Sequence, residues 1–136
     1  MYFMNPYLVQ LPRLLDSRGN LSFIEEERHV PFKIMRVYWV YDVPGGEYRG
    51  DHAFRETEEF IVAISGSFDL RLNDGRKEYK FSLNRSYNGV YVPPMIWRTL
   101  ENFSTNSLAL IIASTVYSDA DYIRDFNHFK DQLIHD

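Results

Sequence analysis

The segment RGDHAFRETEEF, residues 49–60, concentrates side chains that are suited to acid–base or metal chemistry. His52 and Glu58 have the spacing of ligands in a metal-binding barrel, which would place a second histidine where Phe54 stands. Residues two apart on a strand share a face, so His52 and Phe54 point the same way and Asp51 points away. A catalytic metal site uses three protein ligands or more, and phenylalanine has no lone pair to offer. We therefore expect a site that works without a metal ion.

The imidazole of His52 is suited to act as a general base, because an unperturbed histidine titrates at about pH 6.5. Arg49 lies three residues before it, and the segment RVY contributes Arg36 and Tyr38, which share one face of a strand. Guanidinium groups and a phenol around a lone imidazole favour the binding of a carbonyl or phosphate oxygen. The structural alternative makes His52 a half-buried strand residue, Arg36 a surface residue with a packed stem, and Tyr38 part of the core.

The elements that hold these residues belong to a chain of 136 residues, which is the size of one domain. Apolar residues make up 45% of the chain and aromatic residues 16%. A fold of this size buries roughly two-thirds of its unfolded surface without needing disulfides. The net charge of −4 argues against a nucleic-acid partner, since nucleic-acid-binding domains carry a basic surplus. An anionic ligand must therefore be held by local arginines.

The chain has no cysteine, which excludes disulfides, thiolate nucleophiles and cysteine-ligated metals. Its opening stretch, MYFMNPYLVQLPRLL, lacks the basic start of a signal peptide. No apolar run approaches the ~20 residues that a membrane span requires. We expect a cytoplasmic protein with no membrane partner.

Alternation of apolar and polar residues with period two dominates the chain and predicts β-strands. In FDLRLNDGRKEYKFSL, residues 68–83, two alternating runs flank Asp74-Gly75, which is a strong hairpin signal. The run EEFIVAIS precedes this hairpin, with Gly66 in the turn between them. The segment FKIMRVYWVYDV, residues 32–43, is rich in β-branched and aromatic residues and is predicted to form a long, largely buried strand.

Short strands separated by turns, followed by one helix, indicate an all-β jelly roll whose barrel covers about residues 7–117. Apolar residues change to helical spacing near the C-terminus, at Tyr122, Phe126, Phe129 and Leu133. We expect one amphipathic helix over about residues 119–134, packed on the outside of the barrel, with Ser118 and Asp121 forming a capping box at its start. Residues 1–136 then form a single domain.

Two groups of residues resemble the sequence motifs of the cupins, which are small jelly rolls. The first group is Gly50, His52, Phe54, Glu58 and Gly66, and the second is Gly89, Pro93 and Asn102. Metal-binding cupins have a second histidine in the first motif and another histidine in the second. Here those positions hold Phe54 and the pair Trp97-Arg98, and the charge of Arg98 would repel a cation.

Several segments, in order and nearly end to end, resemble the sugar 3,4-ketoisomerase family, the WxcM-like cupins that act on dTDP-4-keto-6-deoxyhexoses. They are LLDSRGNLSFIEE, PFKIMRVYWVYDV, RGDHAF, ISGSFDLRLNDG, GVYVPPMIWRTLENFS and YSDADYIRDFNHFK. The resemblance implies a homodimeric enzyme that needs no cofactor. It also implies that a base removes the proton at C3, that an enediolate forms, and that the ketone moves from C4 to C3. The product would feed an aminotransferase in the synthesis of surface glycans such as lipopolysaccharide.

Residue by residue, the resemblance makes His52 the base and places Tyr38 and Arg98 near the sugar oxygens. It assigns substrate binding to Arg18, Arg36, Arg49 and Trp97, without deciding which arginine takes the diphosphate. For Trp97, as for Tyr38, the alternative is an ordinary place in the core.

One departure from the family pattern affects the chemistry. Many members have two histidines in HAH, whereas this chain has HAF, so Phe54 replaces the second one. His52 must then both remove and return a proton, or a tyrosine or a water must take one of these roles. Two other functions stay open on sequence alone: a cupin that binds a sugar nucleotide without chemistry, and a 3- or 5-epimerase that uses the same enolate chemistry.

Overall fold

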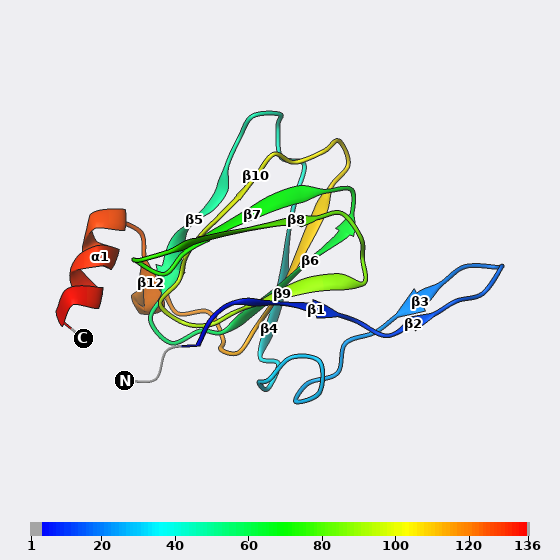
Figure 1. The fold of residues 1–136 in the computed structure, drawn as a ribbon, viewed down its shortest axis with the longest axis horizontal. Helices are drawn as coiled ribbons and strands as arrows, with labels where there is room; N and C mark the ends of the chain where they lie inside the picture. Colours follow the sequence, from blue (N-terminus) through cyan, green and yellow to red (C-terminus); the bar gives the residue numbers. More distant parts are fainter. Residues whose placement is uncertain (1–3, 136) are drawn as a thin grey trace.

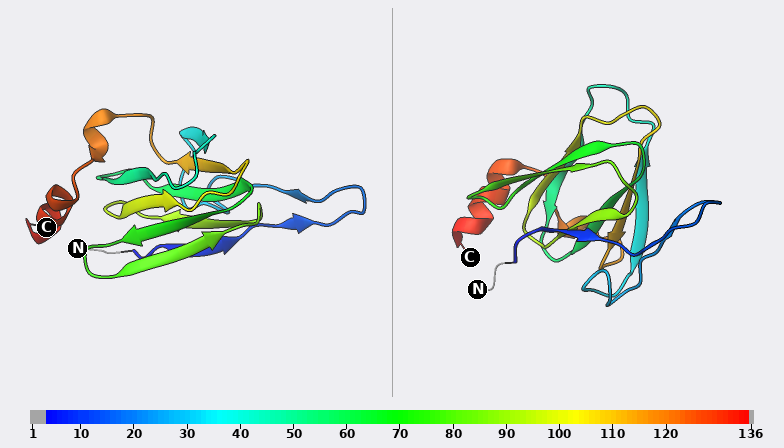
Figure 2. Two further views of the ribbon diagram at one scale, coloured as in Figure 1. Left: turned by 90° about the horizontal axis from the view of Figure 1, so that it is seen from above. Right: turned by 45° about the vertical axis from the view of Figure 1, so that its right-hand side comes forward.

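Two five-stranded antiparallel sheets pack face to face in the computed structural model, which describes residues 4–135 (Figures 1 and 2). The first sheet consists, in spatial order, of β1 (Tyr7–Gln10), β9 (Asn88–Val92), β6 (Glu59–Ser65), β11 (Leu108–Ala113) and β4 (Arg36–Tyr41). The second consists of β12 (Tyr122–Ile123), β5 (Arg49–Phe54), β10 (Trp97–Glu101), β7 (Phe68–Asn73) and β8 (Glu78–Leu83). The architecture confirms the predicted all-β jelly roll.

The main core lies between the two sheets, where the inward-facing residues of the alternating strands meet. In the hairpin of β7 and β8, Phe68 pairs with Leu83 and Leu70 pairs with Phe81, as the sequence predicts. The turn between these strands includes Gly75, whose φ of 95° lies in the region that favours glycine. Local turn chemistry and alternation together therefore set the register of this hairpin.

Strand β4 differs from its prediction as a long, largely buried strand. It covers only Arg36–Tyr41, and every second side chain is exposed. Val37, Trp39 and Tyr41 are 46%, 55% and 60% exposed, because β4 is an edge strand and no part of the described chain covers its outer face. The inward-facing Tyr38 packs against the core. The residue types identified the strand correctly, but the prediction that it is largely buried is wrong.

A two-stranded arm, formed by β2 (Arg13–Leu14) and β3 (Leu21–Ser22), extends away from both sheets (Figure 1). A hydrogen bond from the amide of Gly19 to the carbonyl of Asp16 (2.9 Å) closes its turn. The large apolar side chains of the arm are more than half exposed: Leu14, Leu15 and Leu21. Arg18 lies in the turn that joins the two strands of this arm.

The C-terminal helix begins later than predicted. Helix α1 covers Phe126–His135, and the residues before it form the 3₁₀ turn η1 (Asp119–Asp121) and the strand β12. Ser118 makes no side-chain cap, so the predicted capping box is wrong. The amide of His128 instead donates to Oδ1 of Asp125 at 2.9 Å, which caps α1 at its actual start.

Non-local contacts hold the segment before α1 in an extended conformation. Tyr122 pairs in register with Phe54 of β5. Asp121 accepts hydrogen bonds from the amides of Glu56 (2.7 Å) and Thr57 (3.2 Å), and also from the hydroxyl of Thr57. Helix α1 packs on the outside of the second sheet, as predicted (Figure 1). The helices within residues 4–135 lack the length and hydrophobicity of a membrane-spanning helix.

Candidate active site

A cavity of about 270 Å³ opens between the two sheets, beside β5 and β10. The polar side chains on its wall include Tyr38, Arg49, His52, Arg98, Tyr122 and Arg124. They come from β4, β5, β10 and the segment that begins with β12, so the cavity is assembled from residues that are distant in the sequence. A wall with three guanidinium groups and one imidazole suits an anionic ligand.

His52 presents an imidazole without a protein partner to this cavity. Its ring centroid lies 4.8 Å from that of Phe54 and 4.8 Å from that of Tyr122, and its Nε2 is buried without a hydrogen bond. Burial is the largest cause that lowers the pKa of His52 to about 2, followed by the positive charges of Arg98 and Arg124. The ring is therefore neutral near pH 7, and a neutral imidazole keeps one nitrogen lone pair for a proton.

A buried network joins Arg98, Glu59 and Tyr38 in the cavity wall. The side chains of Arg98 and Glu59 are 2% and 1% exposed and form an ion pair. The hydroxyl of Tyr38 donates to Glu59 and accepts a hydrogen bond from Nη2 of Arg98 at 2.9 Å. Burial is the largest single influence on the pKa of Arg98 and lowers it, but the charge of Glu59, its hydrogen bond and the two nearby tyrosines together raise this pKa above its ordinary value. Burial raises the pKa of Tyr38, so both groups keep their protons at neutral pH.

Gly50 allows the guanidinium of Arg98 to lie against the backbone of β5. Its φ of 88° favours glycine, and a Cβ at this position would lie 2.5 Å from Nη1 of Arg98. The carbonyl of Gly50 also accepts a hydrogen bond from Nη1 of Arg98 at 3.2 Å. The glycine of the cupin-like motif, Gly50, therefore leaves room for the guanidinium of Arg98 and helps to position its charge.

The glutamate in this network is Glu59, whereas the motif spacing indicated Glu58. Glu58 lies on the outer side of the first sheet, where it accepts a hydrogen bond from the hydroxyl of Tyr91 at 2.6 Å. Because β6 begins at Glu59, the inward-facing position is one residue later than the motif suggested. Within residues 4–135, no three histidine, aspartate or glutamate side chains are grouped closely enough to hold a metal ion.

Comparison with known proteins identifies the family. The family model described as FdtA: WxcM-like, C-terminal, matches residues 4–133. The chain belongs to this family. A relative from Aneurinibacillus thermoaerophilus, named TDP-4-oxo-6-deoxy-alpha-D-glucose-3,4-oxoisomerase, is 36% identical over 127 residues, which cover 93% of this chain and 91% of the relative.

Solved structures of 3,4-ketoisomerases share the fold over nearly their whole length. WlaRB, a TDP-quinovose 3,4-ketoisomerase from Campylobacter jejuni, is 37% identical, with a TM-score of 0.89 over 95% of this chain and 99% of that one. A histidine-to-asparagine mutant of the 3,4-ketoisomerase QdtA from Thermoanaerobacterium thermosaccharolyticum, in complex with TDP-4-keto-6-deoxyglucose, is 29% identical, with a TM-score of 0.92 over 96% and 95%. These matches confirm the resemblance that the sequence segments carry.

The structure brings together most of the residues that the WxcM-like resemblance selected. His52, Tyr38, Arg98 and Arg49 all line the cavity. Arg36 lies beside them, with its guanidinium carbon 5.3 Å from the centre of the Tyr38 ring and its Nε buried without a hydrogen bond. A buried donor without a partner is uncommon in a folded protein, so this atom is suited to a ligand.

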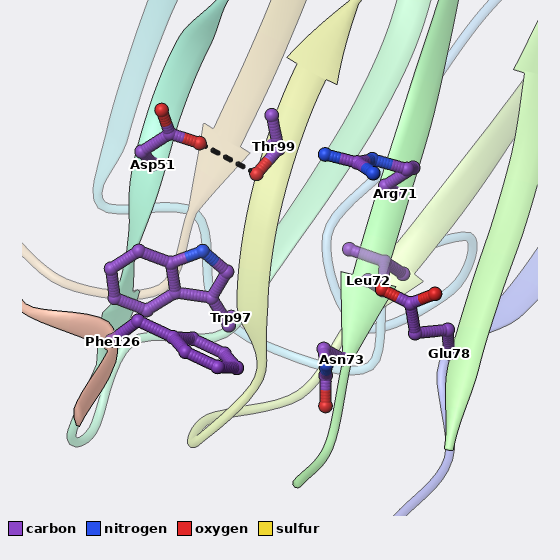
Figure 3. A pocket seen from close by; sticks show the side chains of 8 residues that line it. All are labelled: Asp51, Arg71, Leu72, Asn73, Glu78, Trp97, Thr99 and Phe126. Carbon is purple, nitrogen blue, oxygen red and sulfur yellow. Dashed lines mark hydrogen bonds between the residues drawn. The ribbon is translucent and has the colours of Figure 1, made fainter. Parts of the chain in front are cut away.

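Arg18 and Trp97 do not share this cavity. Arg18 lies on the arm with its side chain 89% exposed. Trp97 directly precedes Arg98 on β10 and therefore points to the other face of the sheet, where its ring packs 5.3 Å from that of Phe126 (Figure 3). Neither Arg18 nor Trp97 lines the cavity around His52, so their role in substrate binding stays a prediction.

The depression that Trp97 lines is a separate feature of the outer sheet face (Figure 3). Asp51 lies on the same face and accepts a hydrogen bond from the hydroxyl of Thr99 at 2.7 Å. This geometry confirms that the carboxylate of Asp51 points away from the imidazole of His52.

Three residues of the cavity and its network were missed by sequence reasoning: Glu59, Tyr122 and Arg124. The helical interpretation of residues 119–134 hid Tyr122 and Arg124, because it placed them on a helix outside the barrel. The segment DYIRD contains the signal that could have found them. Read as a strand, it puts Tyr122 and Arg124 two residues apart on one face.

Proposed function

We propose that the chain is a sugar-nucleotide 3,4-ketoisomerase that moves the ketone of a dTDP-4-keto-6-deoxyhexose from C4 to C3. The observation that carries the proposal is the neutral imidazole of His52, with its unpaired Nε2, in a cavity ringed by arginines. Membership of the WxcM-like family and the names of the relatives at 36% and 37% identity support the same reaction and substrate class.

In the proposed reaction His52 removes the proton from C3 of the bound sugar. The electrons of that bond form a C3–C4 double bond, and the C4 carbonyl becomes an enolate. Arg98 supplies positive charge to the developing oxyanion, an effect that is worth about 10²–10³ in rate for one well-placed donor. The hydroxyl on C3 then loses its proton and becomes the new carbonyl, the oxygen on C4 gains a proton and becomes a hydroxyl, and the carbon-bound proton returns at C4. One carbon is oxidised as its neighbour is reduced, so the exchange needs no external electron carrier.

The arginines beside His52 suit the diphosphate of a nucleotide sugar. Arg49 and Arg124 line the cavity, and Arg36 has a buried Nε without a partner next to Tyr38. A planar guanidinium donates two parallel hydrogen bonds to phosphate oxygens. We assign the diphosphate to this group rather than to the buried Arg98, whose charge is already paired with a carboxylate.

The proposed assembly is a homodimer. The outer face of β4 exposes Val37, Trp39 and Tyr41, and the arm exposes further apolar side chains. A second copy of the chain that covers these surfaces would remove them from water. Such a dimer also gives Arg18 a role, because an arm that projects from one barrel can reach the site of its partner.

The proposed setting is the cytoplasm, in the synthesis of surface glycans such as lipopolysaccharide. The proposed partner is a sugar nucleotide rather than a nucleic acid or a membrane.

The test is to incubate the protein with dTDP-4-keto-6-deoxyglucose and to follow the sugar by NMR. We expect the C4 ketone signal to be replaced by one at C3, and we expect His52→Asn to abolish the change while dTDP binding is retained. An unchanged sugar after hours at high protein concentration would remove the proposal.

A second candidate is a binding protein without chemistry, which the presence of Phe54 in place of a second histidine favours. Its result would be tight dTDP binding with an inert sugar. A 3- or 5-epimerase would instead introduce solvent deuterium at the inverted carbon without moving the ketone, so the same NMR experiment separates all three functions.

A further inference from the structure

Two tyrosines, Tyr38 and Tyr122, line the cavity, and their hydroxyl groups differ in hydrogen bonding. The hydroxyl of Tyr38 donates its proton to Glu59 and accepts a hydrogen bond from Arg98. The proton of the Tyr38 hydroxyl is therefore already used in a hydrogen bond within the protein. The hydroxyl of Tyr122 makes no hydrogen bond within residues 4–135, although the residue lines the same cavity. Tyr122 thus has the free phenolic proton.

Tyr122 lies where it can take the proton-transfer role left open by Phe54, which replaces the second histidine. Phe54 is 3% exposed, and its ring lies 4.6 Å from that of Tyr122, which is its register partner on β12. The ring of Tyr122 also lies 4.8 Å from that of His52. Phe54 is thus buried beneath the neighbouring rings, and the ionisable group that faces the cavity beside His52 at this point is a phenol.

We infer that Tyr122 is a catalytic residue that moves the oxygen-bound proton while His52 moves the carbon-bound one. This inference rests on the proposed ketoisomerase function. As His52 takes the proton from C3, the O–H of Tyr122 breaks and its proton bonds to O4, which gives the enediol, an imidazolium and a phenolate. The phenolate then takes the proton from the hydroxyl on C3, and the imidazolium returns its proton to C4. Both side chains end as they began, and the ketone has moved to C3.

The surroundings of Tyr122 suit a phenol that loses and regains a proton. Burial raises the pKa of Tyr122, so the hydroxyl is protonated at rest. The positive charge of Arg36 lowers this pKa, the charge of Glu59 raises it, and the charge of Arg98 lowers it again; the two guanidinium groups would stabilise a transient phenolate. The guanidinium carbon of Arg124 lies 4.2 Å from the centre of the Tyr122 ring, which holds the ring by a cation–π contact. The ring is therefore fixed from two sides, by Arg124 and by Phe54.

The experiment compares Tyr122→Phe with Tyr117→Phe. The first keeps the ring contacts and removes only the hydroxyl. The second removes the hydroxyl of a neighbouring tyrosine that is 60% exposed and bonded to Asp119 at 3.3 Å. We expect kcat of Tyr122→Phe to fall by about 10²-fold or more, the usual range for loss of an acid–base group. We expect its Kd for dTDP and its thermal midpoint to stay near wild type, and Tyr117→Phe to match wild type throughout.

Tyr122→His, which retains a ring and a proton donor, should recover part of the lost rate. A kcat of Tyr122→Phe within a few-fold of wild type would overturn the inference, as would a loss confined to KM, or a Tyr122→His variant no faster than Tyr122→Phe. If Tyr122→Phe does not fold, Tyr122→His alone decides, and a fully inert folded His variant counts against the inference. Wild-type protein that leaves the sugar unchanged is a different result, since it removes the proposed function itself.

Discussion

His52 and Arg98 lie directly opposite each other on the adjacent strands β5 and β10, and both line the cavity. A cross-strand pair of this kind brings a base and a permanent positive charge to within side-chain contact range. Burial and, after it, the charge of the guanidinium keep the imidazole unprotonated, and the neutral imidazole adds no second charge to a buried site. The register of β5 and β10 therefore places the proposed base and the proposed oxyanion-stabilising group side by side.

The first prediction concerns acid stability. The folded protein keeps His52 neutral down to about pH 2, whereas an unfolded histidine gains a proton below about pH 6.5. The unfolded state therefore binds more protons as the pH falls, and His52 makes folding less favourable in acid. Between pH 7 and pH 5 this group costs about 2 kcal/mol at most. Urea unfolding should show that His52→Gln loses that much less stability than wild type over this interval.

The matched control for His52→Gln is His128→Gln, at an exposed position on α1. This variant should keep the wild-type difference between pH 7 and pH 5. Equal acid sensitivity of wild type and His52→Gln would show that the imidazole is protonated in the folded state, contrary to the prediction.

The second prediction concerns the buried ion pair. Glu59→Ala leaves the guanidinium of Arg98 without its counter-charge at 2% exposure. Removal of one partner of a buried pair typically costs about 3–5 kcal/mol. The free energy of unfolding in urea should fall by this amount. Glu101→Ala breaks the more exposed pair with Arg71 (2.9 Å) and should cost about 0–1 kcal/mol. Similar losses in the two variants would mean that Glu59 does not neutralise Arg98.

The third prediction restores the histidine that this chain lacks. Phe54→His puts a polar ring into a site that is 3% exposed and does not line the cavity. A buried polar group without a partner costs about 1–3 kcal/mol, so thermal or urea unfolding should show a loss of that size. We expect no more than a few-fold change in kcat. A large gain in rate would show that a second imidazole at this position reaches the sugar.

The fourth prediction concerns assembly. Trp39→Glu places a charge in the middle of the exposed face of β4, and sedimentation should then report a monomer where wild type forms a dimer. Val116→Glu, at an apolar residue that is 61% exposed and lies outside this face, should stay dimeric. A wild-type monomer, or a Trp39→Glu dimer, contradicts the assignment of this face.

Elements that depend on neighbouring residues in the chain were predictable. Asp74-Gly75 between two alternating runs determines the β7–β8 hairpin, and the spacing of Arg36 and Tyr38 puts both beside one cavity. The start of the C-terminal helix was not predictable in the same way. Residue spacing after Ser118 is helical, but pairing with β5 is a non-local contact that outweighs local preference.

Site residues that depend on local alternation were also predictable, and those that depend on non-local contacts were not. His52 follows from the alternation within one strand, and so does the outward direction of Asp51. The same alternation should have separated Trp97 from Arg98, since adjacent residues face opposite sides of a sheet. The choice between Glu58 and Glu59 depends on where β6 begins after a turn, and no spacing rule gives that start.

The hydrogen bonds of Asp121 have a consequence for how the protein is made. Residues 119–124 close the cavity wall but leave the ribosome after every other strand of the barrel. Until they dock, Ala53 and Phe54 of β5 have no partner on that edge, and an unpaired strand edge can pair with other chains. The wall of the cavity is therefore completed only after residues 119–124 have been synthesised and Asp121 has accepted its hydrogen bonds from the amide and hydroxyl of Thr57.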